Sequence, residues 1–293
     1  MPIIETFRGR IAGLAWVAAV LACPCTAAAQ GLGKELDTPY VPTPQAVVDR
    51  MLEMAQVKAG DIVIDLGSGD GRIMITAAQR HGAQGFGVEI DPRLVQRSNE
   101  EARRLGVADR VKFLRQDLFN TDFHEANVLT LYLLPDVNIA LRPKILAELK
   151  PGTRVVSHDY DMREWRPDAE ETIPVPGKTV GMRKESMVYL WIVPARVEGE
   201  WIFELSSGGK ARKTRLVLQQ SFQFVSGSVE LTGQGDVAVS DGRLRGEELR
   251  LVLPPGALDR GPVELVGRVR GDSLSGTVRR GGREVANWSA RRR

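Results

Sequence analysis

A short stretch early in the chain carries the residues best suited to chemistry. The apolar run 62–64 stops at Asp65, and Gly67, Gly69 and Gly71 follow at alternate positions before a helix-forming segment. A strand, a glycine turn and a helix together bring a ligand close to bare backbone at a helix N-terminus. The glycine spacing is not the G-x-G-x-x-G of dinucleotide folds. The carboxylate of Asp65 would repel a pyrophosphate and attract an ammonium group.

A second carboxylate is placed to bind a ribose. Residues 84–91 form a second buried, strand-like run, in which Glu89 comes 24 residues after Asp65. An acid at the tip of the second strand of a β-α-β unit can accept hydrogen bonds from both ribose hydroxyls. The alternative role for Glu89, at a helix N-terminus, is already filled by Asp91 followed by Pro92. A ligand with a cationic end and a ribose fits S-adenosyl-L-methionine.

The elements that position these residues alternate between strands and helices. Strands are expected at 62–64, 84–91, 110–114, 126–134, 152–157 and 182–193, with helices at 45–56, 70–81, 93–106 and 138–150. This alternation predicts an α/β fold, a Rossmann-like, doubly wound and mostly parallel sheet with helices on both faces. The carboxyl ends of such strands meet at one edge, where ligands bind. The side chains expected at that edge are Asp65, Glu89, Asp117, Tyr132, His158 and Asp159.

Two features near this edge each have two interpretations. Asp117, after the third strand, either accepts a hydrogen bond from the adenine amino group or is a solvated loop acid. The proline-dense segment 37–44 is extended, because proline disfavours a helix both at its own position and at the preceding one. It is either a linker or a strap that lays Tyr40 over the pocket.

The first residues have the layout of a secretory signal peptide. Arg8 and Arg10 precede an apolar stretch at 11–23, and the alanines at 27–29 form an A-x-A cleavage site. We therefore expect residues 1–29 to be removed. The apolar stretch is short for a transmembrane helix, so no stable membrane span is expected after cleavage. The protein is then periplasmic or secreted, or cytoplasmic if the leader does not function, and export separates it from cytoplasmic S-adenosylmethionine.

Composition excludes several kinds of site. Both cysteines lie in the leader, so the rest of the chain can form neither a disulfide framework nor a cysteine metal site. The three histidines lack ligand-like spacing, and no metal centre is expected. A net charge of +3 is too small to indicate nucleic-acid binding, and the basic residues are not interleaved with aromatic ones.

The C-terminal third has a different pattern. Short alternating stretches separated by glycine turns predict a small antiparallel all-β domain, either a barrel or a sandwich. Strands are expected at 215–218, 222–225, 249–253 and 263–269, with turns at 207–209, 241–242, 270–272 and 281–282. We place a first domain at 30–194 and the β-domain at 195–293. Trp201 and Trp288 are expected in the core of the β-domain, whose role stays open.

The motif Asp-Leu-Gly-Ser-Gly-Asp-Gly-Arg at 65–72, with Gly-Val-Glu at 87–89, resembles the class I S-adenosylmethionine-dependent methyltransferases. With Pro-Tyr-Val-Pro-Thr-Pro at 39–44, the chain looks most like the ATP synthase c-subunit lysine methyltransferases and their bacterial relatives. The resemblance covers about residues 37–170. It implies that Gly67, Gly69 and Gly71 contact the methionine part of the cofactor, Asp65 its ammonium, Glu89 the ribose and Asp117 the adenine.

The resemblance also implies methylation of a protein lysine, with a membrane protein among the candidate substrates. Many relatives that act on nitrogen carry an Asn- or Asp-Pro-Pro-Tyr motif where this chain has Tyr-Leu-Leu-Pro at 132–135, so the acceptor atom stays open. A lysine ammonium must first lose a proton, and Asp159, His158 and Tyr132 are the candidate catalytic residues. His158 could instead bond the backbone, and Tyr132 could pack against a helix. The alternative functions are a small-molecule methyltransferase and an exported nucleoside-binding protein without catalysis.

Overall fold

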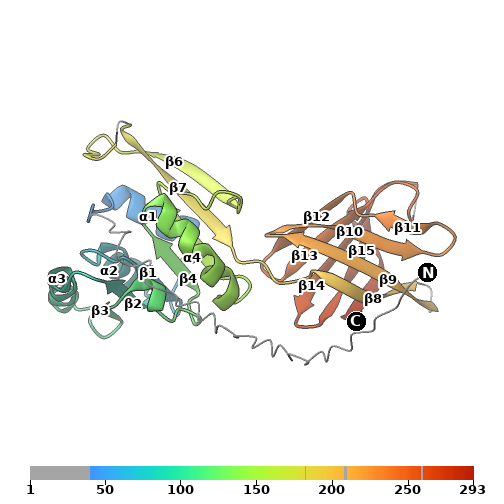
Figure 1. Cartoon of the computed structure of the whole chain (residues 1–293), viewed down its shortest axis with the longest axis horizontal. Coiled ribbons are helices and arrows are strands. Elements are labelled where there is room, and N and C mark those ends of the chain that lie inside the picture. The colour runs from blue at the N-terminus through green and yellow to red at the C-terminus, as the bar shows by residue number, and fades with distance from the viewer. Residues whose placement is uncertain (1–39, 182, 208–209, 259) are drawn as a thin grey trace, which may run out of the picture.

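A computed structural model describes residues 40–181, 183–207, 210–258 and 260–293, which form two sheets (Figure 1). The first sheet has seven strands in the order β3-β2-β1-β4-β5-β7-β6 and the second has nine. The predicted signal peptide, its cleavage site and both cysteines lie outside the described residues, as does the first part of the proline-dense segment.

The first sheet and its helices confirm the predicted α/β fold. Its elements are α1 (Gln45–Met54), β1 (Ile62–Leu66), α2 (Arg72–His81), β2 (Gln84–Glu89), α3 (Pro92–Arg104), β3 (Val111–Arg115), a 3-10 turn (Leu118–Asn120), β4 (Val128–Leu131), α4 (Pro135–Glu148), β5 (Arg154–His158), β6 (Ala169–Pro174) and β7 (Glu185–Ile192). Strands β1 to β5 pair in parallel, and β7 pairs antiparallel with β5 and β6. The carboxyl ends of the parallel strands therefore meet at one edge.

Helices cover both faces of this sheet. Buried side chains of α1, α2 and α3 share one apolar cluster with one face, and those of α4 share another with the opposite face. Helix α4 begins earlier than expected, because Pro135 occupies its first turn, where the missing N–H costs no hydrogen bond. Strand β6 was not predicted. It is an edge strand that is half-buried only at alternate positions, so it carries no apolar run.

The second sheet closes into a barrel, which decides between the two predicted architectures. Its strands are β8 (Gly199–Ser207), β9 (Lys210–Ser221), β10 (Phe224–Leu231), β11 (Gly235–Ala238), β12 (Asp241–Arg245), β13 (Glu248–Leu253), β14 (Val263–Arg270), β15 (Ser273–Arg280) and β16 (Arg283–Arg292). All neighbouring strands are antiparallel. The β9–β10 pairing closes the eight strands other than β11, which pairs with β10. Trp201 and Trp288 are buried in its core, as expected.

Two details of the barrel were predicted wrongly. Residues 241–242 belong to β12 rather than to a turn. Gly242 is required there because a Cβ would lie 2.3 Å from the carbonyl oxygen of Val225. Residues 222–223 form the turn between β9 and β10 rather than part of a strand, and Phe222 has a φ of 55°. In both places the residue type is compatible with strand and turn, and strand pairing decides between them.

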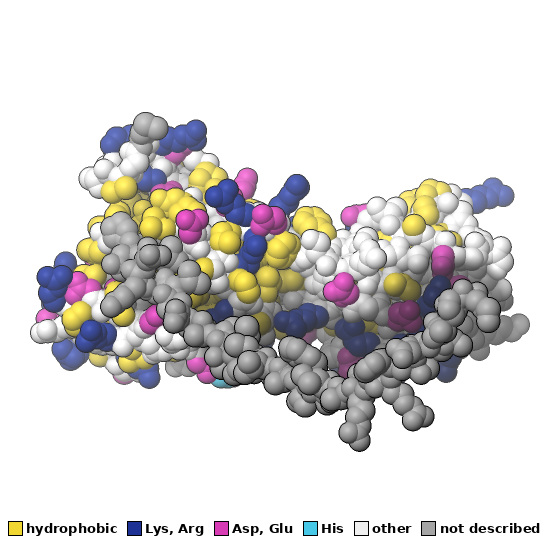
Figure 2. Space-filling model, viewed as in Figure 1, with side chains coloured by type: hydrophobic (Ala, Val, Ile, Leu, Met, Phe, Trp, Pro, Cys, Tyr) yellow, Lys and Arg dark blue, Asp and Glu magenta, His cyan; other side chains and the backbone are white. Residues whose placement is uncertain are grey.

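Side-chain contacts join the two halves of the chain. Arg243 of β12 forms an ion pair of 3.2 Å with Asp168, and Phe222 stacks on Trp165 at 6.1 Å between ring centroids. On the face shown in Figure 2, Lys and Arg side chains lie beside Asp and Glu side chains over both halves. Within the described ranges no helix is long and apolar enough to cross a membrane.

Candidate functional site

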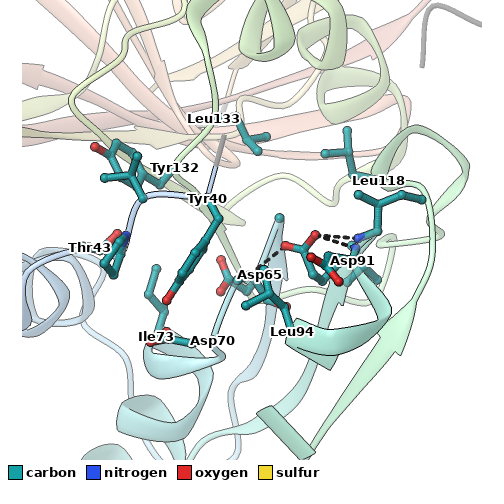
Figure 3. A pocket seen from close by; sticks show the side chains of 18 of the residues that line it. Tyr40, Thr43, Asp65, Asp70, Ile73, Asp91, Leu94, Leu118, Tyr132 and Leu133 are labelled. Carbon is teal, nitrogen blue, oxygen red and sulfur yellow. Dashed lines mark hydrogen bonds between the residues drawn. The ribbon is translucent and has the colours of Figure 1, made fainter. Parts of the chain in front are cut away.

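A pocket of about 270 Å³ opens at the carboxyl edge of the parallel strands (Figure 3). The loop after β1 lines it with Gly67 and Gly69, whose φ angles of 75° and 53° favour glycine. The amides of Gly67 and Ser68 both donate to the carbonyl oxygen of Val88 on β2, which fixes the loop against the neighbouring strand.

Asp65 forms the floor of the pocket with one carboxylate oxygen unpaired. Its side chain is buried, and Oδ1 accepts a hydrogen bond of 2.6 Å from the hydroxyl of Thr130. Thr130 lies directly opposite Asp65 in the β1–β4 register. Oδ2 is buried without a hydrogen-bond partner among the described residues. Burial raises the pKa of Asp65 to about 7, because a carboxylate removed from water is disfavoured in its charged form.

Glu89 lines the pocket with a carboxylate that three backbone amides hold in place. Oε2 accepts a hydrogen bond of 3.0 Å from Gly69, and Oε1 accepts bonds of 2.7 Å and 3.0 Å from Ile90 and Asp91. Asp91 itself caps α3 by accepting from the amide of Arg93 at 2.8 Å. The helix cap is therefore filled without Glu89, and the fixed carboxylate keeps lone pairs for a ribose.

Asp117 lines the pocket and also holds the local backbone. Its carboxylate accepts a 2.8 Å hydrogen bond from the amide of Phe119 at the start of the 3-10 turn. Leu118 and Phe119 line the same part of the pocket. Asp117 is thus beside the pocket with a structural role, and its oxygens keep further acceptor capacity for an amino group.

The proline-dense segment forms a strap across the pocket in its described part. The ring of Tyr40 lies over Gly69, where an added Cβ would come within 2.8 Å of the ring. The Tyr40 hydroxyl is hydrogen-bonded to Asp70, and Nη1 of Arg72 donates to the carbonyl oxygen of Thr43 at 2.8 Å. Although burial acts in the opposite direction, Arg72 lowers the pKa of Asp70 and keeps this anchor charged.

Gly71 does not line the pocket. It has a φ of 78° and precedes α2, and an added Cβ would lie 2.4 Å from the ring of Phe113. The third glycine therefore allows close packing of the turn against β3, whereas Gly67 and Gly69 face the pocket.

The three candidate catalytic residues are neighbours, and only Tyr132 lines the pocket. Burial, Asp159 and Tyr160 raise the pKa of Tyr132 to about 12, so its hydroxyl stays protonated near neutral pH and does not act as a base. The His158 ring lies 3.9 Å from the Tyr132 ring, between centroids, and is fully buried.

His158 and Asp159 lie outside the pocket lining, and their side chains form hydrogen bonds to other parts of the first half of the chain. The His158 ring bonds to the hydroxyls of Thr43 and Ser186 at 3.3 Å and 2.9 Å, and burial lowers its pKa to about 4. Asp159 accepts from Lys178 at 2.7 Å and from the amide of Met187 at 2.9 Å. In this conformation neither reaches the pocket. His158 therefore has the structural role given above as the alternative to catalysis, although its partners are the hydroxyls of Thr43 and Ser186 rather than the backbone.

Sequence reasoning did not select Thr130, Arg72 as the anchor of the strap, or Tyr160. Thr130 had a readable signal, because it is the one polar residue of β4, in a run that is otherwise apolar. Arg72 and Tyr160 had none, since their roles depend on Thr43 and Tyr132, which are distant in sequence.

The pocket residues fit S-adenosylmethionine. The unpaired, buried oxygen of Asp65 can accept a hydrogen bond from the ammonium, whose positive charge would favour the ionised carboxylate. Gly67 and Gly69 leave backbone exposed where the aminoacyl chain would lie, and Glu89 offers fixed acceptors to the ribose. When bound, this cofactor supplies a methyl group on an electrophilic sulfonium, and the protein contributes alignment and exclusion of water.

Comparisons with known proteins identify the family. The ANTKMT methyltransferase domain matches residues 65–169. A protein-lysine N-methyltransferase of Saccharolobus islandicus is 44% identical over 156 residues, which cover 53% of this chain and 93% of that protein. The chain belongs to this methyltransferase family. It is therefore an S-adenosylmethionine-dependent methyltransferase, as its sequence predicted.

Two further relatives of this methyltransferase are informative about coverage. The ATP synthase c-subunit lysine N-methyltransferase of Xenopus laevis is 36% identical, and the match covers 46% of this chain and 59% of that protein. The chain thus spans about three-fifths of the length of this relative. A solved Salinibacter ruber structure, titled as an RNA methyltransferase with S-adenosyl-L-homocysteine, is 52% identical with a TM-score of 0.48, covering 54% of this chain and 96% of that one.

Proposed function

We propose that this methyltransferase transfers the methyl group to the side-chain amine of a protein lysine. The observation that carries the proposal is the 44% identity to an archaeal protein-lysine N-methyltransferase across 93% of its length. The matched region contains the glycine loop after β1, the pocket acid Glu89 and the strand ends next to Tyr132 and Asp159. The relatives that methylate a lysine of the ATP synthase c-subunit add support for a protein acceptor.

The acceptor end of the pocket suits an uncharged amine. Leu133 and Val137 are buried there beside Tyr132, and all three line the pocket. An apolar environment disfavours the ammonium form and so lowers the pKa of an entering amine. The proton leaves to water before transfer, and the protein's task is to hold the neutral nitrogen in line with the methyl group.

The test is transfer of a labelled methyl group from S-adenosylmethionine to extracts of the source cells by the purified full chain. We expect label that protease releases, that nuclease leaves in place and that amino-acid analysis recovers as methyl-lysine. Asp65→Ala should abolish transfer, whereas Asp109→Ala, which changes a largely exposed acid far from the pocket lining, should retain it. Label released by nuclease, or found only in small molecules, would contradict the protein acceptor.

We also propose that residues 1–29 direct export to the periplasm or the medium. The support is the order of two arginines, an apolar stretch and an A-x-A site in the sequence. Cell fractionation of the C-terminally tagged chain should recover a shortened protein outside the cytoplasm, starting at Gln30. A chain lacking residues 2–29 should stay in the cytoplasm. Recovery of the uncut full chain in the cytoplasm would overturn this proposal without affecting the proposed reaction.

A further inference from the structure

A second tyrosine lies beside Tyr132, just outside the pocket lining. The rings of Tyr132 and Tyr160 are nearly parallel, with 6.3 Å between centroids and 16° between planes, and both side chains are half-buried. Figure 3 shows Tyr132 on one side of Tyr40, and Asp91 and Leu118 on the other. Glu89, the acid proposed to bind the ribose, accepts a hydrogen bond from Asp91 and so lies on the side of Asp91 and Leu118. The side of Tyr132 is therefore the one left for an acceptor.

The backbone of Tyr160 is held more firmly than a loop residue requires. Its carbonyl oxygen accepts hydrogen bonds from Ser157 Oγ at 2.7 Å and from Asn138 Nδ2 at 3.2 Å, and both donors are buried. Its amide donates to the carbonyl oxygen of His158 at 2.8 Å. Two buried side chains on different elements thus fix the point from which this ring projects.

The residue before Tyr160 adopts an unfavourable conformation. Asp159 has a φ of 62°, a region that costs free energy for residues other than glycine. The conformation persists because both carboxylate oxygens are bonded, one to Lys178 and the other to the amide of Met187. Such strain is commonly found at functional sites. The sharp turn after β5 sets the direction of Tyr160.

We propose that Tyr160 contacts the acceptor and, together with Tyr132, binds its alkylammonium group by cation–π attraction at the entrance to the pocket, before the amine loses its proton and moves in beside Leu133 and Val137. This inference rests on the proposed function, because it concerns a cationic side chain that enters beside Tyr132. Aromatic faces attract ammonium groups without hydrogen bonds, and this attraction is retained when the nitrogen is methylated. Asp159 is already paired with Lys178, so the rings rather than a free carboxylate supply the recognition.

The kinetic experiment compares Tyr160→Phe and Tyr160→Leu in the full chain. We expect Tyr160→Leu to raise the acceptor KM about tenfold while the Kd for S-adenosylmethionine stays within twofold, since a cation–π contact of this kind corresponds to roughly that change. Tyr160→Phe should keep the KM of the wild type, because the ring face is retained. Tyr189→Leu is the matched control, since Tyr189 is a half-buried tyrosine on β7 that packs against Trp191 and does not line the pocket.

A binding experiment separates this inference from the proposed function. Tetramethylammonium, titrated by NMR into the complex with S-adenosylhomocysteine, should shift resonances near Tyr132 in the wild type and not in Tyr160→Leu. This readout needs no lysine substrate, so it decides the inference even if the transfer assay finds another acceptor. Equal binding of tetramethylammonium by both proteins, or by neither, would overturn the role of Tyr160. So would a KM rise in Tyr189→Leu equal to that in Tyr160→Leu.

Discussion

The unpaired oxygen of Asp65 makes cofactor affinity depend on pH. In the free protein burial raises the pKa of Asp65 to about 7, so below this pH the carboxyl is mostly protonated. A ligand ammonium binds only the ionised form strongly, and the proton must leave first. The ligand's own α-amino group has a pKa near 8 and stays charged throughout the acid range.

The size of the effect follows from this single pKa. For a group with a pKa of about 7, affinity should fall about fivefold between pH 7 and pH 6 and almost tenfold for each further unit. It should therefore be about 16-fold weaker at pH 5.5 than at pH 7. The sign is fixed, because the complex favours the carboxylate and the free protein favours the acid. Binding should therefore release about half a proton at pH 7 and nearly one proton at pH 5.5.

Titration calorimetry with S-adenosylhomocysteine measures both quantities, since it carries the same ammonium. Runs in buffers of different ionisation enthalpy give the number of protons released. Asp65→Asn should bind weakly with a flat pH profile, because its amide does not ionise. Asp109→Asn, on the exposed side chain, should keep the slope of the wild type. An affinity that is equal at pH 5.5 and pH 7 in the wild type, with no proton released, would refute the assignment of Asp65 to the ammonium.

Four further experiments test the site. In the cofactor-free protein, Asp65→Asn should raise the free energy of unfolding at pH 8 by on the order of 4 kcal/mol and leave it nearly unchanged at pH 4. The reason is that the raised pKa of Asp65 makes the native state lose stability as the pH rises from 3.8 to about 7. Thermal unfolding at the two pH values measures the difference. Glu89→Gln should weaken cofactor binding by about 1–3 kcal/mol, since an amide nitrogen would face backbone donors, and an unchanged Kd would rule out the ribose role. Gly69→Ala should weaken binding and lower the melting temperature, and adding Tyr40→Ala should restore part of the melting temperature if the ring is what the methyl group meets. Because the pKa of His158 is lowered to about 4, its contribution to stability should disappear as the pH falls from 6.5 through 4, and His158→Gln should flatten the acid limb of the stability curve.

The local sequence determined the α/β half and the chemistry of its pocket. Asp65 ends an apolar run and precedes alternating glycines, and this strand-to-turn change is encoded by neighbouring residues. Parallel strands that alternate with helices leave one edge for a ligand, so the location of Glu89, Asp117 and Tyr132 follows from topology alone. The barrel was predictable as a meander of strands, because alternation and glycine turns are also local signals.

Only the tertiary structure decided which residues at that edge face the ligand. His158 ends β5 and Asp159 follows it, and both looked equivalent to Tyr132 in the sequence. Their hydrogen bonds with Ser186 and Lys178 instead hold them away from the pocket. Closure of the barrel likewise depends on the β9–β10 pairing, which no single strand specifies. The periodicity of the sequence indicates whether a side chain is buried, but contacts between residues distant in sequence determine what it is buried against. In this protein those contacts decide that Tyr132 lines the pocket and that His158 and Asp159 do not.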